Sequence, residues 1–199
     1  MPYDTWGQYE SAERWTSYYT QVNEILGFSG ATCLEVGVGN GIVTDALKRQ
    51  QIQVTTLDID PTLEPDIVGS VSNIPLPDQS IDVVLCAEVL EHLPFDQFEN
   101  CIKELARVSR LGLVLSLPHW GYTVRAIIDL PGLPGVRTSW KLPVTTSTPQ
   151  GIHEWEIGRK GYPLVRIASL IKKYFILQKD WVSPWMPYHH FFRLVKHCS

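Results

Sequence analysis

The stretch Leu34–Gly41 limits the possible folds of this chain more than any other part of the sequence. It reads LEVGVGNG, follows a short apolar run at 31–33 and leads into the segment Ile42–Arg49. This order predicts a buried strand, a tight turn rich in glycine and then a helix. Glycines in such a turn leave no Cβ between the backbone and a ligand. The unpaired N–H groups at the start of the helix are available to that ligand. We therefore expect a nucleotide-like molecule at this turn.

The segments after the turn alternate between apolar strands and helices, which predicts an α/β fold. The run at 81–87 is apolar almost throughout, as in a parallel strand covered on both faces. Two closing strands are joined by a link so short that they must be antiparallel. We expect one domain over residues 1–199, with a mostly parallel sheet, helices on both faces and an antiparallel C-terminal hairpin strand. The expected strands are 31–36, 54–57, 67–70, 81–87, 111–117, 175–182 and 189–196, and the later helices are 95–108 and 162–173.

Two segments stand outside this alternation. Residues 1–30 read as an N-terminal helical cap, with an aromatic-rich helix from about residue 5 to residue 26 that ends at Gly27. Residues 118–152 hold five prolines and read as an insertion or lid. We expect this insertion to be helical near Val124–Leu130 and otherwise loop, because long loops in compact domains commonly cover binding sites.

The composition limits the kinds of partner that this chain is expected to bind. The net charge is −4 and the pI about 5.8, so the chain lacks the basic face of a nucleic-acid-binding protein. No apolar run approaches the length of a membrane span, and the first residues lack the features of a signal peptide. The cysteines are scattered without a CxxC pair and read as free thiols of a reducing compartment; they are Cys33, Cys86, Cys101 and Cys198. We expect a cytoplasmic protein with no nucleic-acid partner and no stable membrane insertion.

The residues around the turn favour one class of ligand. A dinucleotide site needs a small residue where this chain has Ile42, and the third glycine, Gly41, comes one position early. Glu35 precedes the turn and Asp58 ends the second strand, where an acid can accept both hydroxyls of a ribose. The pattern favours an adenosyl ligand without a pyrophosphate. An NAD-binding oxidoreductase is the less favoured alternative.

Four motifs, in order between residues 31 and 117, carry a family resemblance: LEVGVGNG at 34–41, LDID at 57–60, IPLPDQSIDVV at 74–84 and AEVLEHL at 87–93. With them the chain resembles the class I S-adenosylmethionine-dependent methyltransferases, and among these the UbiE/UbiG-like methyltransferase domain family. The resemblance implies a Rossmann-like seven-stranded methyltransferase fold and S-adenosylmethionine as cofactor. It implies methyl transfer to a small-molecule acceptor through a nucleophile positioned in line with the sulfonium methyl, on oxygen, nitrogen or carbon. A non-catalytic S-adenosylmethionine-binding module is the alternative.

The resemblance also implies roles for individual positions. Glu35, Gly37 and Gly39 would lie against the methionine part of the cofactor. Asp58 would hold the ribose, and Ile59 would pack on the adenine. Ser70 stands where many relatives have an acid for the adenine amino group. Ala87 and Glu88 would border the methyl-transfer centre. The full expected cofactor-binding set is Glu35, Gly37, Gly39, Asn40, Asp58, Ile59, Ser70, Val71, Ala87 and Glu88.

Catalytic candidates lie outside these motifs. His119 follows the fifth strand, where sites of this topology open. His153 with Glu154 reads as a base and the group that orients it. The same pair could instead hold a metal ion, but two such residues make no metal motif, so we expect no metal. We interpret His92 as structural rather than catalytic. His189 and His190 alternate along a strand, so at most one of them faces a pocket.

Overall fold

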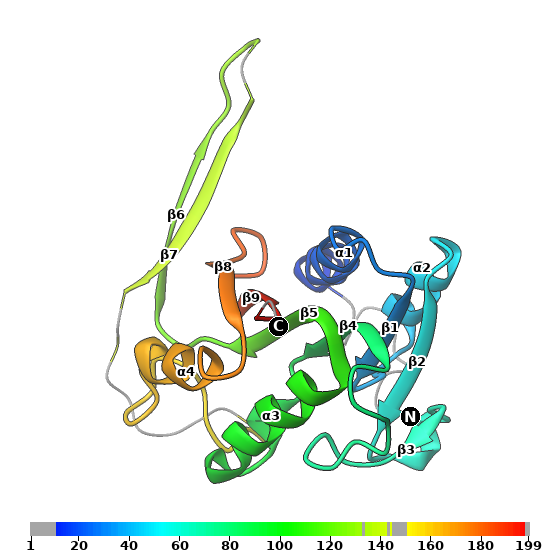
Figure 1. The fold of residues 1–199 in the computed structure, drawn as a ribbon. Coiled ribbons are helices and arrows are strands. Elements are labelled where there is room, and N and C mark those ends of the chain that lie inside the picture. Colours follow the sequence, from blue (N-terminus) through cyan, green and yellow to red (C-terminus); the bar gives the residue numbers. More distant parts are fainter. Residues whose placement is uncertain (1–10, 133, 143, 145–150, 198–199) are drawn as a thin grey trace.

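The computed structural model describes residues 11–132, 134–142, 144 and 151–197, and within them seven strands form one sheet (Figure 1). The strand order is β3-β2-β1-β4-β5-β9-β8. The first five of these are parallel to one another, whereas β9 is antiparallel to both β5 and β8. This confirms the expected fold class. The strands are β1 Thr32–Val36, β2 Gln53–Asp58, β3 Ile67–Val68, β4 Ile81–Ala87, β5 Ser109–Pro118, β8 Ile176–Val182 and β9 His189–Val195.

Helices cover both faces of the sheet, and each face has its own apolar core (Figure 1). Helices α1 (Ala12–Leu26) and α2 (Ile42–Arg49) pack on one face. Helices α3 (Phe98–Val108) and α4 (Leu164–Ile171) pack on the other. Three short 3₁₀ turns complete the connections: η1 Pro61–Leu63, η2 Leu90–His92 and η3 Phe95–Gln97.

The order of the strands places a crevice between β1 and β4. From β1 the chain moves outward through β2 to β3, then crosses back to β4 on the other side of β1. Helices leave on opposite sides at such a reversal, and ligands of open α/β sheets bind outside the carboxyl ends of the strands there. Val36 pairs with Cys86 in the register, so Gly37 and Ala87 follow at the same edge.

The N-terminal helix begins later than its aromatic pattern suggested. Ser11 is its N-cap and accepts a hydrogen bond from the N–H of Arg14 at 3.2 Å. Residues 5–10 of the expected helix, and the start of the expected cap at 1–10, lie outside the described residues. Gly27 ends the helix as expected, in a right-handed conformation.

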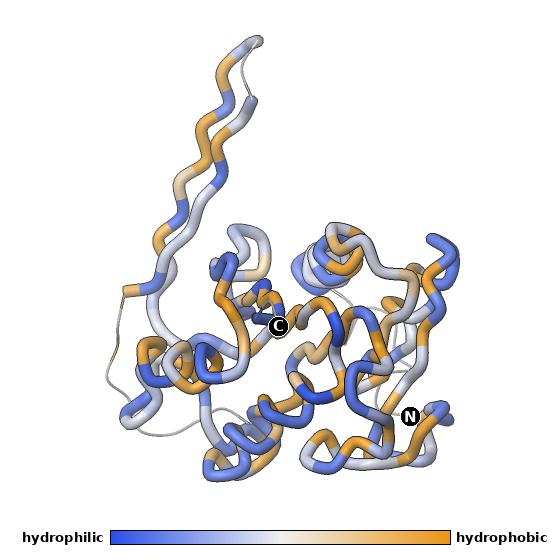
Figure 2. Tube along the Cα trace, in the orientation of Figure 1, coloured by the Kyte–Doolittle hydropathy of each residue, from blue (hydrophilic) through white to orange (hydrophobic). Residues whose placement is uncertain are grey.

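The expected helix near Val124–Leu130 is wrong, because this segment forms a strand. Strand β6 (Tyr122–Ile128) pairs antiparallel with β7 (Val136–Leu142) as a two-stranded hairpin that projects from the body of the molecule (Figure 1). Val124, Ile127 and Ile128 are β-branched and favour a strand once a partner strand is available. Figure 2 shows that hydrophobic residues of this hairpin alternate with hydrophilic ones.

Cys33, Cys86 and Cys101 are buried and unpaired, as predicted, and Cys198 lies outside the described residues. Among the helices described, none combines the length and the apolar character needed to span a bilayer.

Candidate functional site

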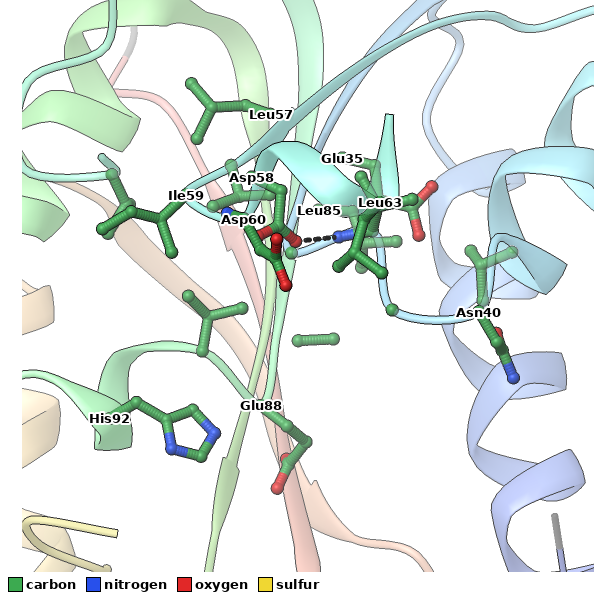
Figure 3. A pocket seen from close by; sticks show the side chains of 18 of the residues that line it. Glu35, Asn40, Leu57, Asp58, Ile59, Asp60, Leu63, Leu85, Glu88 and His92 are labelled. Atoms are coloured by element: carbon green, nitrogen blue, oxygen red, sulfur yellow. Dashed lines mark hydrogen bonds between the residues drawn. The ribbon is translucent and has the colours of Figure 1, made fainter. Parts of the chain in front are cut away.

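A pocket of about 450 Å³ opens at the carboxyl ends of β1, β2 and β4, where the strand order reverses (Figure 3). Figure 3 shows Asp58, Asp60 and Leu63 on one side of it and Glu88 and His92 on the other. All ten expected cofactor-binding residues line it: Glu35, Gly37, Gly39, Asn40, Asp58, Ile59, Ser70, Val71, Ala87 and Glu88.

The turn that lines the pocket needs its glycines for two different physical reasons. Gly37, Gly39 and Gly41 have φ of +83°, +56° and +74°, in the left-handed region that side chains disfavour. A Cβ on Gly37 would stand 2.4 Å from Cγ2 of Val89, so the turn and the loop after β4 are in close contact there. A Cβ on Gly39 would meet no atom within 4 Å, because that side is open to the pocket.

The acid before the turn is buried. Glu35 is only 4% exposed, and the hydroxyl of Thr44 on α2 donates a hydrogen bond to its Oε2. Burial raises the pKa of Glu35 to about 7, although the bond from Thr44 acts in the opposite direction. Glu35 therefore carries a proton in a large fraction of molecules at neutral pH.

The acid at the end of β2 is held in place by backbone groups. The N–H of Val38 donates to Oδ2 of Asp58 at 2.9 Å, and the N–H of Asp60 donates to Oδ1 at 2.9 Å. These bonds fix the carboxylate next to the glycine turn and leave lone pairs on both oxygens for a ligand. Next to it Ile59 is 74% exposed, an apolar side chain at the pocket mouth.

Apolar side chains form the wall beside Asp58, and they are Leu57, Ile59, Leu63, Val71 and Leu85. Ser70 also lines the pocket, but its hydroxyl forms a local hydrogen bond with Ser72 Oγ at 2.8 Å. An apolar slot beside a carboxylate suits a flat heterocycle joined to a diol.

The comparisons with known proteins agree with this geometry. Residues 34–116 match the model of a methyltransferase domain family. This part of the chain therefore resembles a methyltransferase domain. A curated relative, the mitochondrial ubiquinone biosynthesis O-methyltransferase of Schizosaccharomyces pombe, is 36% identical over 83 residues. That match covers 33% of this chain and 30% of the relative, so it spans less than a third of the relative's length.

Solved structures share the fold over nearly the whole chain. The N-methyltransferase NodS from Bradyrhizobium japonicum WM9, solved with S-adenosyl-L-homocysteine, has a TM-score of 0.63 at 12% identity and covers 97% of this chain and 92% of its own. The 1,6-didemethyltoxoflavin-N1-methyltransferase of Burkholderia thailandensis has a TM-score of 0.61 at 14% identity and covers 96% and 80%. At such identities the likeness concerns the fold. The chain thus shares the fold of these solved structures.

Beyond β4, the pocket contains a half-buried acid and a buried histidine. Glu88 has a left-handed backbone (φ 55°) and accepts a hydrogen bond from the Ser116 hydroxyl at 2.8 Å. Burial raises its pKa to about 8. Nε2 of His189 lies 3.5 Å from Glu88 Oε2. A non-glycine residue with this backbone conformation is strained, and such strain is concentrated at functional sites.

Ser17 on helix α1 holds this histidine from the other side. Gln21 Nε2 donates to the Ser17 hydroxyl at 3.2 Å, and Ser17 Oγ lies 2.9 Å from Nδ1 of His189. Burial lowers the pKa of His189 to about 3, so the imidazole is neutral.

The structure does not bring the three expected catalytic residues together. His119 is buried outside the pocket lining, with its Nδ1 2.9 Å from Nδ1 of His190. Glu154 is exposed and also outside the lining. His153 lies instead beside His92, with ring centroids 5.0 Å apart.

Several lining residues were missed or interpreted as structural. His92 and His189 both line the pocket, and of the pair at 189–190 only one does, as the alternation predicted. Helix α1 adds four more residues, Arg14, Ser17, Tyr18 and Gln21. Their spacing of three or four positions places them on one face of the helix, which is the signal in the sequence for a helix that covers a site.

Proposed function

We propose that the protein is an S-adenosylmethionine-dependent methyltransferase that acts on a small-molecule acceptor. The observation that carries the proposal is the Asp58 carboxylate, fixed by the N–H of Val38 at the rim of a pocket that the glycine turn leaves open. This combination suits the ribose of an adenosyl group. The matched family model and the likeness to an O-methyltransferase support the same reaction type.

The residues present fit the cofactor. The cavity of about 450 Å³ lies within the range of small-molecule sites. Asp58 would bind the ribose hydroxyls, and the exposed Ile59 would cover one face of the adenine. Glu35 and the backbone at Gly37 and Gly39 would hold the methionine part. When bound, the cofactor supplies an activated methyl group, whose transfer to an acceptor leaves S-adenosylhomocysteine.

The chain's own part in the reaction is to position the acceptor, exclude water and receive any proton that the acceptor loses. Glu88 is the base that the geometry favours over His119 and Glu154, because its carboxyl lines the pocket and is oriented by Ser116. A pKa of about 8 places its ionised form within reach at slightly alkaline pH. We infer a small-molecule acceptor, as in the didemethyltoxoflavin methyltransferase of the same fold.

The proposal is tested by titrating the protein with S-adenosylhomocysteine in a calorimeter. Asp58→Ala should remove most of the affinity, whereas Asp129→Ala, a substitution of an exposed acid on the projecting hairpin, should leave it unchanged. Binding of NAD(H) without binding of S-adenosylhomocysteine would overturn the proposal in favour of the oxidoreductase.

Binding alone does not establish transfer. The second test therefore supplies cofactor with a labelled methyl group together with fractionated small molecules of a cell extract. Transfer of label to a small molecule supports the methyltransferase. Tight binding without label transfer to any fraction supports the non-catalytic cofactor-binding module instead.

A further inference from the structure

One buried carboxylate beside the pocket has no hydrogen-bond partner. Glu91 lies in η2 and is fully buried, and neither of its oxygens is hydrogen-bonded to any described residue. A buried carboxylate without partners is strongly disfavoured unless a proton or a cation accompanies it. The two unpartnered oxygens of Glu91 are therefore open to a ligand that carries positive charge.

Two imidazoles lie within reach of the same carboxylate. Nε2 of His92 is 4.0 Å from Oε1 of Glu91, and the ring of His153 packs edge-on against the ring of His92. One ligand atom from each of Glu91, His92 and His153 lies within 4.8 Å of the others. Ligands bound to a common metal at about 2.0–2.2 Å are roughly 3–4 Å apart, so small side-chain rotations would close the site.

His153 is held from outside the cluster, as a metal-binding histidine usually is. Nδ1 of His153 lies 3.1 Å from Oε1 of Glu156, which leaves Nε2 of His153 for a ligand. Glu156 is itself buried and accepts a hydrogen bond from Arg159 Nε at 2.7 Å.

We propose that Glu91, His92 and His153 bind a divalent transition-metal ion such as Zn²⁺ at the edge of the pocket. Two imidazoles and one carboxylate form a donor set that suits Zn²⁺ and neighbouring first-row ions better than Mg²⁺ or Ca²⁺. This proposal differs from the expectation of no metal, because the fold brings His153 together with His92 and Glu91.

Three protein ligands leave at least one coordination position open. His92 lines the pocket, and Figure 3 shows its imidazole pointing toward Glu88. The open position is therefore within reach of a molecule bound in the pocket. The metal site itself stands on Glu91 and the two histidines, and only its use by an acceptor rests on the proposed methyl transfer.

The test measures metal binding directly. After dialysis against a chelator, the protein is titrated with Zn²⁺ in a calorimeter, and with Co²⁺ while its visible absorption is recorded. We expect about one Zn²⁺ per chain and a Co²⁺ spectrum of low coordination number. Glu91→Gln and His153→Gln should each weaken Zn²⁺ binding by roughly tenfold or more. Mg²⁺ should compete weakly.

Matched controls separate this site from adventitious binding. His197→Gln removes an exposed histidine, and Glu99→Gln removes a glutamate that is paired with Lys173 away from the cluster. Both variants should keep the wild-type affinity. Circular dichroism shows whether each variant is folded. If Glu91→Gln does not fold, His153→Gln and His92→Gln provide the same test.

Three outcomes overturn the metal site: no Zn²⁺ binding by the chelated protein, unchanged binding in folded His153→Gln and His92→Gln variants, or loss of binding in His197→Gln. S-adenosylhomocysteine is titrated into the same metal-free samples. If the wild-type protein does not bind S-adenosylhomocysteine, the proposed function fails while the metal result stands. The two failures are therefore distinguishable.

Discussion

The contact between Gly37 and Val89 offers a direct test of how the glycine turn and the loop after β4 fit together. Gly37→Ala carries two penalties. The left-handed backbone costs a residue with a Cβ roughly 1–2 kcal/mol. The new methyl would also stand 2.4 Å from Val89 Cγ2, and overpacking of this kind costs roughly 1–3 kcal/mol. We expect Gly37→Ala to lower the free energy of unfolding by roughly 2–5 kcal/mol.

Gly39→Ala is the matched control, because its backbone is also left-handed but its Cβ would meet no atom within 4 Å. It should cost only the backbone part, roughly 1–2 kcal/mol. Urea denaturation followed by circular dichroism gives both values, provided the transitions are two-state.

Val89→Ala should relieve the clash, since Cβ of Val89 is 3.8 Å from the position of the new methyl, an ordinary contact. Alone, this substitution of a half-buried valine should cost about 1 kcal/mol. Combined with Gly37→Ala it should show a favourable coupling of roughly 1–3 kcal/mol. Strict additivity of the two single variants, or equal costs for Gly37→Ala and Gly39→Ala, would refute the reasoning.

Three further predictions concern buried polar groups. Burial acts to raise the pKa of Asp82, but hydrogen bonds from the N–H groups of Ala31 and Thr32 outweigh it and lower the pKa. Asp82→Asn should therefore destabilise the protein by roughly 1–3 kcal/mol at neutral pH, and by less in urea titrations run below about pH 3.8. Because the pKa of Glu35 is raised to about 7, the wild type should lose up to roughly 3 kcal/mol of stability as the pH rises from 4.5 to about 7. Glu35→Gln should not show this loss when its thermal unfolding is followed over the same pH range. Trp155→Ala should cost roughly 3–5 kcal/mol in urea, because the ring is fully buried and its N–H donates to the Leu93 carbonyl.

Each of these has a result that would contradict it. Equal destabilisation by Asp82→Asn at neutral and acid pH would show that the ionised form is not what the backbone binds. A pH profile of Glu35→Gln parallel to that of the wild type would place the titration elsewhere, and Glu154→Gln, at an exposed glutamate, serves as its control. A loss below about 1 kcal/mol for Trp155→Ala would mean that the segment after the insertion does not pack as the structure has it.

The elements nearest the glycine turn could be predicted because their signals are local. The expected helix Ile42–Arg49 and the expected strand at 81–87 agree with α2 and β4. In both cases a run of residues that favour the same kind of element is bounded by turn residues. The prediction of that element therefore depends little on distant parts of the chain. That the expected cofactor-binding residues line one pocket was predictable for a related reason, since residues at the carboxyl ends of neighbouring parallel strands must meet.

The insertion could not be predicted in the same way. The segment that forms β6 is short and apolar, and such runs do not separate helix from strand by periodicity. What decides is the partner strand β7, whose pairing register joins Ile128 to Val136 and Tyr122 to Leu142. Neither segment alone carries that information.

The metal candidates illustrate the same limit at the level of side chains. His92 and His153 are far apart in sequence, and the carbonyl of Glu91 accepts the N–H of Glu154 at 2.8 Å, which aligns the two segments. The sequence pairs His153 with its neighbour Glu154, whereas the fold turns Glu154 outward and places His153 against His92.

Buried acids connect the two proposals. Glu35, Glu88 and Glu91 lie in or beside one pocket, and burial raises the pKa of each. A chain selected for stability alone would replace such groups with apolar ones, because each lowers the stability of the ligand-free protein above its unfolded pKa. A cation that takes the place of the proton removes this penalty. The proposed cofactor carries a sulfonium and an amino group, and the proposed site at Glu91 takes a divalent ion. The same arrangement of acids that destabilises the empty protein therefore favours the binding of positively charged ligands.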